Sequence, residues 1–222
     1  MLPLLVLRPE PGAPRTADKA RRLGLDPVVL PLFEAVAREW TAPDPAGFDA
    51  LMLTSANAVR LGGAQLALFV SVPVYAVGAA TATAARAAGF DVVAVGESDA
   101  AALVARIIAD GRAQVLHLAG HDRIALGSGE RITAVTVYAV DDCPVTLPEG
   151  AAVALIHSPR AARRFAALCP SRAQIDIVAI SAAAATAAGD GWRSVCAVPR
   201  PDDDAMLELA VRLCQRSDDD RL

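Results

Sequence analysis

Small polar residues and arginines recur in this chain where short apolar runs give way to helix-length stretches. The set comprises Arg8, Thr54, Ser55, Asn57, Gly78, Thr81, Gly120, Arg123, Arg160, Ser158 and Ser181. Taken singly, the small residues are explained by helix capping and the arginines by a solvated surface. Helix starts also bind anions, because their N–H groups are unpaired and the helix dipole is positive there. Together with charge-assisted bonds from arginine, they predict a site for a ligand with several carboxylates or phosphates.

One tyrosine has a position that suggests a role beside such a site. Tyr138 is one of only two tyrosines and lies in an extended segment, where its hydroxyl could reach a ligand. Tyr75 falls within an apolar run and is expected to be structural. The three histidines show no metal-ligand spacing, and His117, inside a predicted strand, is expected to be a satisfied core histidine.

The usual catalytic motifs are missing from the sequence. It holds no Gly-x-Ser-x-Gly elbow, no P-loop and no Gly-x-Gly-x-x-Gly, which argues against a nucleotide-dependent Rossmann enzyme. Its four cysteines have no metal-pair spacing and are expected to be free thiols in a reducing compartment. Gly127-Ser128-Gly129 follows no strand and is interpreted as a flexible loop, and the acidic tail 217–222 as frayed.

The elements that must position these residues alternate along the chain. Apolar runs predict strands at 4–7, 28–30, 50–53, 74–77, 92–95, 115–118, 135–140, 153–156, 177–180 and 195–198. Amphipathic stretches predict helices such as 16–23, 56–61, 81–88, 100–108, 161–168 and 205–213. This pattern is typical of doubly wound parallel α/β structure, in which ligands bind at the carboxyl ends of the strands. The uncharged run 61–85 is broken by Pro73 and Gly78, so a strand, turn and helix explain it better than a membrane span.

The chain also repeats itself. Ser55 and Ser158 end similar apolar runs, Gly78 and Ser181 end another similar pair, and both pairs lie 103 positions apart. The repeat predicts two domains of one fold with a ligand cleft where they face each other. The domains could follow in tandem, with a boundary near Asp110–Arg112. Alternatively, the segments Leu32–Trp40 and Ala134–Asp142 could be linker strands between exchanged halves, and periodicity alone leaves both layouts open.

The overall charge excludes one class of partner. The chain has 21 Lys and Arg against 25 Asp and Glu, a formal net charge of −4. A nucleic-acid binder that relies on a bulk positive field is therefore not expected. The N-terminus lacks a basic region followed by a long apolar run, so we expect a cytoplasmic protein with no membrane partner.

The order and spacing of several short motifs resemble the uroporphyrinogen-III synthase family over nearly the whole length. They are Leu7-Arg8-Pro9, Thr54-Ser55-Ala-Asn57, Val77-Gly78-Ala-Ala-Thr81, Leu118-Ala-Gly120 with Arg123, Val137-Tyr138, His157-Ser158-Pro159, Ala179-Ile180-Ser181 and Arg200-Pro201. The resemblance implies two flavodoxin-like domains joined by a two-stranded linker. It places residues 1–33 plus 141–222 in one domain and 34–140 in the other.

The resemblance also implies a function. The substrate would be hydroxymethylbilane, a linear tetrapyrrole with eight carboxylates, which a lyase cyclises with inversion of the last pyrrole and loss of water, without metal or organic cofactor. It implies that Tyr138 assists departure of the hydroxyl, and that Thr54, Ser55, Gly78, Thr81, Gly120 and Ser158 line the binding site. We expect a monomer in haem biosynthesis, with at most transient contact with the upstream enzyme. The alternative is a non-catalytic two-domain binding protein for a small polyanionic metabolite.

Two regions depart from the family pattern. Where the family often has threonine after Ser181, this chain has four alanines, Ala182–Ala185, so a hydroxyl contact is lost or moved to Thr186. The segment Ile124–Ile132 is too short for a full helix.

Overall fold

The computed structural model describes residues 1–97, 100–123 and 131–215 in two compact units. Unit 1 consists of Met1–Glu34 and Asp142–Leu222, and unit 2 of Ala35–Asp141. The boundaries inferred from the family resemblance are 33/34 and 140/141. A division near Asp110–Arg112 is wrong, because the strand that follows this segment pairs with Ala50–Leu53 of unit 2. The expectations for Gly127 and for the tail lie outside the described residues.

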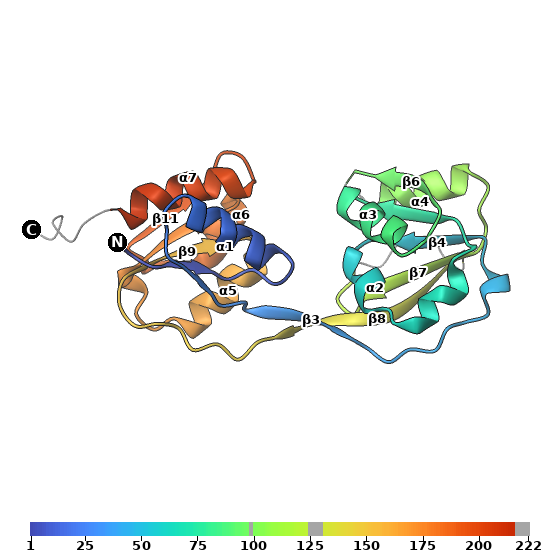
Figure 1. The fold of residues 1–222 in the computed structure, drawn as a ribbon, viewed down its shortest axis with the longest axis horizontal. Coiled ribbons are helices and arrows are strands. Elements are labelled where there is room, and N and C mark those ends of the chain that lie inside the picture. The colour runs from blue at the N-terminus through green and yellow to red at the C-terminus, as the bar shows by residue number, and fades with distance from the viewer. Residues whose placement is uncertain (98–99, 124–130, 216–222) are drawn as a thin grey trace, which may run out of the picture. The chain divides into compact units, whose positions relative to one another are not determined.

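Unit 1 is built on a five-stranded parallel sheet, sheet A, in the order β11-β10-β9-β1-β2. Its strands are β1 (Leu4–Val6), β2 (Pro27–Val29), β9 (Ala152–Ile156), β10 (Ile175–Ala179) and β11 (Ser194–Ala197). Its helices are α1 (Gly12–Arg22), α5 (Pro159–Leu168), α6 (Ala182–Ala188) and α7 (Asp203–Cys214), with a 3-10 turn at Arg172–Gln174. Helices α1 and α7 pack on one side of the sheet, and α5 lies on the other (Figure 1).

Unit 2 carries a six-stranded sheet, sheet B, in the order β3-β8-β7-β4-β5-β6. Its strands are β3 (Phe33–Ala37), β4 (Ala50–Leu53), β5 (Val74–Val77), β6 (Val92–Gly96), β7 (Val115–Gly120) and β8 (Ile132–Asp142). Its helices are α2 (Ala56–Leu61), α3 (Ala79–Ala87) and α4 (Ala100–Ala109), with 3-10 turns at Pro45–Gly47 and Ala64–Phe69. The expected strands are present, and the α/β prediction is confirmed, with a parallel sheet in unit 1.

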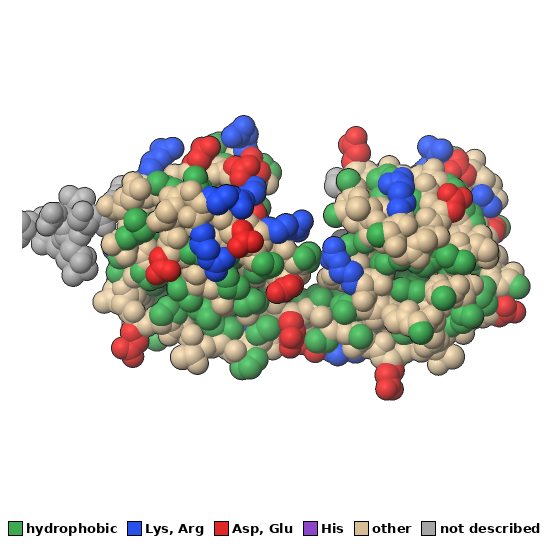
Figure 2. Space-filling view, in the orientation of Figure 1, with side chains coloured by type: hydrophobic (Ala, Val, Ile, Leu, Met, Phe, Trp, Pro, Cys, Tyr) green, Lys and Arg blue, Asp and Glu red, His purple; other side chains and the backbone are tan. Residues whose placement is uncertain are grey.

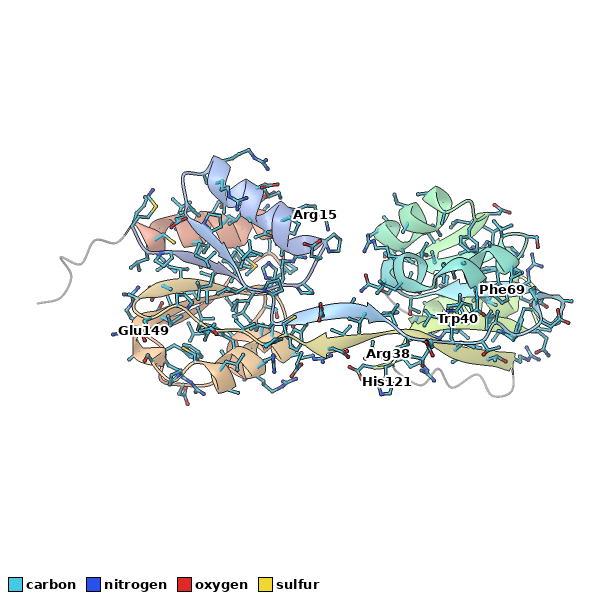
Figure 3. The ribbon with its side chains drawn as sticks, turned by 60° about the horizontal axis from the view of Figure 1, so that its bottom comes forward. Arg15, Arg38, Trp40, Phe69, His121 and Glu149 are labelled. Carbon is cyan, nitrogen blue, oxygen red and sulfur yellow. The ribbon has the colours of Figure 1, made fainter. Side chains whose placement is uncertain are left out.

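Alternating side chains on each buried strand of unit 2 serve two cores. Leu51 and Leu53 of β4 face a cluster with Phe69, which α2 and α3 help to cover. Trp40 lies against Phe69, with ring centroids 6.3 Å apart (Figure 3). Met52 points to the opposite face, where α4 packs. Because both faces are covered, these strands are apolar throughout, as buried parallel strands usually are.

The chain passes between the units twice, within β3 and within β8, which pair side by side (Figure 1). The amide of Arg38 donates to the carbonyl of Val137 at 2.9 Å, and that of Cys143 to Leu32 at 3.0 Å. Because the partner numbers run in opposite directions, this pairing is antiparallel, and sheet B is mixed.

No helix among the described residues is long and apolar enough to cross a membrane. The uncharged run 61–85 forms the 3-10 turn Ala64–Phe69, β5 and most of α3, as expected. Basic and acidic side chains are interspersed over the face of each unit drawn in Figure 2.

Candidate functional site

At the carboxyl edge of sheet B, the first contact to consider lies between the neighbouring strands β4 and β7. Thr54 follows β4, and its hydroxyl lies 3.1 Å from Nε2 of His117 on β7. Met52 and His117 are opposite each other in the register, and Thr54 lies two residues beyond Met52, so its side chain points to the same face. His117 is 3% exposed, and this contact satisfies it as expected for a core histidine.

Two helix starts at this edge differ in how they are capped. Ser55 precedes α2 with extended backbone angles, and its hydroxyl accepts from the amide of Asn57 in the first turn of that helix. Gly78 begins α3 with a φ of 78°, a conformation that disfavours a side chain. The first-turn N–H groups of any helix have no acceptor within the helix. In α3 no side chain of the described residues serves as a cap for them either. Ala79 and Ala80 in that turn are exposed.

Tyr138 and Gly120 meet at the end of β7. They are opposite each other after a register shift between Ala119 and Gly120. A Cβ atom added to Gly120 would lie 2.8 Å from Cζ and 2.9 Å from the hydroxyl oxygen of Tyr138. The phenol therefore rests on bare glycine backbone, and a larger residue at position 120 would displace it. The Tyr138 residue is 9% exposed.

Arg123 lies at the same edge. Its Nη1 donates to the hydroxyl of Thr136 at 2.7 Å and to the carbonyl of Gly120 at 3.5 Å. Burial, with a smaller contribution from the positive charge of Arg123, lowers the pKa of His117 to about 4. The imidazole is therefore neutral near pH 7.

At the carboxyl edge of sheet A, several polar side chains contact Asp203. Nη1 of Arg8, after β1, donates to both carboxylate oxygens of Asp203 at 2.7 and 2.9 Å. Thr16 of α1 donates to Asp203 at 2.7 Å, and Nε2 of His157, after β9, lies 3.0 Å from it. These partners, the His157 bond foremost, hold the pKa of Asp203 below its ordinary 3.8 despite burial. The Arg8 guanidinium lies over Gly12, where a Cβ would come within 2.3 Å of its Nε.

The serines of unit 1 are bonded to their own helices. The hydroxyl of Ser158 accepts from the amide of Ala161 at 3.1 Å, and that of Ser181 from Ala184 at 3.2 Å. With Ser55, these contacts confirm the capping interpretation for the three serines. Thr186 lies more than a turn beyond the start of α6.

The residues predicted to bind a ligand fall into two groups. Unit 2 gathers Thr54, Ser55, Gly78, Gly120, Arg123 and Tyr138 at the end of its strands, and unit 1 gathers Arg8, Ser158 and Ser181. Asn57 lies on α2, where its Oδ1 accepts from Arg60 at 3.4 Å, and Thr81 is 5% exposed, within the α3 packing surface. Arg160 packs over the Phe33 ring, 4.5 Å from its centroid.

Cavities of about 590 Å³ in unit 2 and 780 Å³ in unit 1 lie elsewhere. The first is lined by Ala37–Thr41 and Leu61–Gln65, and the second by Val145–Gly150, Leu168–Ser171, Gln174 and Ile175. They include none of the predicted site residues. Across the described ranges, no group of three or more His, Cys, Asp or Glu side chains could hold a metal ion.

The sequence reasoning missed Asp203 and the pairing of His157. The acidic run Asp202–Asp204 at the start of a predicted helix was the available signal, because carboxylates favour that position. Nothing in the sequence pointed to Arg8 as the partner. Nδ1 of His157 is buried and has no partner among the described residues.

Solved structures share this fold. The uroporphyrinogen-III synthetase of Helicobacter pylori matches with a TM-score of 0.68 at 19% identity, over 96% of this chain and 99% of that chain. A mutant uroporphyrinogen III synthase of the extremely thermophilic bacterium Thermus thermophilus gives 0.52 at 15% identity, over 98% and 100%. At these identities the likeness defines a class of α/β fold and no more. No curated protein sequence matches the chain.

The sequence itself narrows the class to a family. The family model described as uroporphyrinogen-III synthase HemD matches residues 14–208. The chain therefore belongs to the uroporphyrinogen-III synthase family, which confirms the resemblance noted above. The chain is accordingly a lyase-type enzyme of tetrapyrrole biosynthesis.

Proposed function

We propose that this chain converts hydroxymethylbilane into the cyclic tetrapyrrole with an inverted last ring, with loss of one water. The match to the family over residues 14–208 is the observation that carries this proposal. The polar residues at the carboxyl edges of the two sheets support it, because ligands of open α/β sheets bind at such edges.

The substrate supplies most of the reactivity. A pyrrole nitrogen lone pair forms a C=N bond and expels the hydroxyl, leaving an electrophilic azafulvene. Attack by the substituted carbon of the last pyrrole gives a spiro intermediate, and its rearrangement inverts that ring. Because ring closure without inversion also occurs spontaneously, the enzyme must mainly hold the chain in one conformation.

In this proposal Tyr138 donates a hydrogen bond to the departing hydroxyl. A phenol hydroxyl has an O–H donor that can act in this way. The contact with Gly120 supports the role, because bare backbone fixes the ring without a competing side chain.

The carboxylates of the substrate need donors that do not make the surface strongly basic. We propose that the α3 start at Gly78 and the hydroxyl of Thr54 supply donors in unit 2. The remaining proposed contacts are Ser55, Asn57, Thr81, Gly120, Arg123, Ser158, Ser181 and Arg8. Arg8 is expected to contribute least, because Asp203 already balances its charge.

We also propose that both units are flavodoxin-like. Sheet A, read in the chain order of its own strands, has the order 2-1-3-4-5 typical of that fold. The parallel strands of sheet B have the same order if β7 and β8 are counted first. The N-terminal strands β1 and β2 thus occupy in unit 1 the places that β7 and β8 take in unit 2. We further propose a monomeric cytoplasmic enzyme that needs no cofactor and has at most transient contact with the upstream enzyme.

The test is to supply freshly generated hydroxymethylbilane and to separate the cyclised isomers. The inverted isomer should form faster than spontaneous closure. Accumulation of the uninverted isomer alone, at the rate without protein, would refute the proposal. Because carboxylate binding is electrostatic, KM should rise with ionic strength, and a KM insensitive to salt would argue against these contacts.

A further inference from the structure

His117 is a polar residue on a face of β7 whose neighbouring side chains are apolar. Val115, on the same face of β7, packs with Met52 and with Leu103 of α4. His117 is 3% exposed, yet its partner at the edge is the hydroxyl of Thr54 at 3.1 Å. Burying a polar side chain destabilises the folded state unless that side chain is hydrogen-bonded. Thr54 is also a residue to which the proposed function assigns a substrate contact.

The direction of this hydrogen bond decides what Thr54 can do. A neutral imidazole has one N–H donor and one acceptor nitrogen, whereas a hydroxyl has one donor and two acceptor sites. If Nε2 carries the proton, His117 donates and the Thr54 hydroxyl proton is available to another acceptor. If Nε2 is bare, Thr54 must donate to it and has no proton left for a ligand. A carboxylate only accepts, so binding one requires the first arrangement.

We propose that His117 is a positioning residue: its Nε2–H donates to Oγ1 of Thr54 and thereby directs the threonine hydroxyl proton to a substrate carboxylate. This inference rests on the proposed function and adds to it a residue that does not touch the substrate. The neutral state of the imidazole supports it, since burial and the charge of Arg123 lower the pKa of His117. A neutral imidazole orients the hydroxyl without adding a second positive charge near Arg123.

Two amide variants separate this role from a packing role. In His117→Gln the side-chain amide nitrogen reaches the place of Nε2 and can donate to Thr54. In His117→Asn the amide reaches only the place of Nδ1. We expect wild-type KM for Gln, and for Asn and for His117→Leu a KM raised roughly tenfold with kcat nearly unchanged, because a hydrogen bond to a charged group is lost.

A double-mutant cycle links the two residues. Thr54→Val removes the hydroxyl and should raise KM by a similar factor. If His117 acts through Thr54, adding His117→Leu to Thr54→Val raises KM no further. Two effects that multiply, or a Gln variant as impaired as Leu, would overturn the proposal. Circular dichroism and urea unfolding establish that each variant is folded.

The tautomer of His117 can be determined by NMR, without an activity assay. In the ¹⁵N spectrum of histidine-labelled protein at neutral pH, the signals lost in His117→Gln belong to His117. We expect a protonated Nε2 and a bare Nδ1, and the opposite tautomer would overturn the proposal. If the wild-type chain forms no inverted isomer, the proposed function fails, while this spectrum still reports on the His117–Thr54 bond. If the wild type is active and His117→Leu has an unchanged KM, only the positioning role fails.

Discussion

The carboxyl edges of the two sheets follow the same sequence plan but differ in what they leave for a ligand. In unit 1 the serines cap their own helices, and Asp203 binds Arg8, Thr16 and His157. In unit 2 the equivalent of Ser181 is Gly78, which starts α3 with no side-chain cap among the described residues. Tyr138 and Thr54 lie at the same edge. The charges of Arg8 and Asp203 in unit 1 are thus already paired, whereas the first-turn amides of α3 in unit 2 have no cap among the described side chains.

The comparison predicts a division of roles. Variants at the edge of unit 2 should change the reaction, whereas variants at the edge of unit 1 should mainly change stability.

The largest effect is expected at Tyr138. Tyr138→Phe removes the proposed donor to the leaving hydroxyl and should lower kcat on the order of 10²-fold, with little loss of stability. Tyr75→Phe is the matched control, because its hydroxyl bonds to Asp110 at 3.1 Å within unit 2. The control should cost about 1 kcal/mol in unfolding free energy and leave kcat unchanged. Equal kcat for the wild type and Tyr138→Phe would remove Tyr138 from the mechanism.

The next effect concerns the acid of unit 1. Asp203→Asn leaves Arg8 without a counter-charge and should lower the free energy of unfolding by about 2 kcal/mol at pH 7. Since the folded-state pKa lies below 3.8, the ion-pair stabilisation is present above that pH and is lost as pH falls through the folded value. The difference between the wild type and Asp203→Asn should therefore shrink below pH 3.8 in urea titrations.

The control for this variant is Asp204→Asn. Asp204 pairs with Lys19, but its side chain is 70% exposed, so the change in stability should be small. A loss of turnover in Asp203→Asn without a loss of stability would place Asp203 in the reaction and contradict the division.

A smaller effect is expected at Gly120. Gly120→Ala places a methyl group 2.8 Å from the Tyr138 ring, so the phenol must move, and kcat should fall roughly tenfold. Gly47→Ala is the control, because no atom lies within 4 Å of its added Cβ. If Gly120→Ala in the Tyr138→Phe background lowers kcat as much as it does in the wild type, Gly120 does not act through Tyr138.

The smallest effects are expected at the caps. Ser158→Ala and Ser55→Ala each remove one cap bond and should cost about 1 kcal/mol of unfolding free energy. The division predicts that Ser55→Ala also raises KM, and raises it more than Ser158→Ala does. A larger KM effect from Ser158→Ala in the steady-state assay would reverse the comparison.

Local patterns were sufficient to predict the strands, most helices and the serine caps. A buried parallel strand needs an uninterrupted apolar run, and a helix start needs a capping side chain, so both leave a signal within a few residues. The short helix α6 was indicated only by its capping residue Ser181, because its alanine-only first turn has no amphipathic pattern.

Contacts between distant residues left no such signal. The Arg8–Asp203 pair joins residues 195 positions apart. The approach of Tyr138 to Gly120 depends on a register shift that sequence periodicity does not show. Periodicity likewise could not choose between tandem and exchanged halves, because the same runs fit both sets of strand pairings. The choice came from the family resemblance.

The division is tested most directly by amide hydrogen exchange with and without the bound cyclic product. The account predicts a larger slowing at Ala79–Thr81, whose amides begin α3 without a described cap, than at Ala182–Ala184, where Ser181 already accepts from Ala184. Stronger protection at Ala182–Ala184, or no change at Ala79–Thr81, would contradict it.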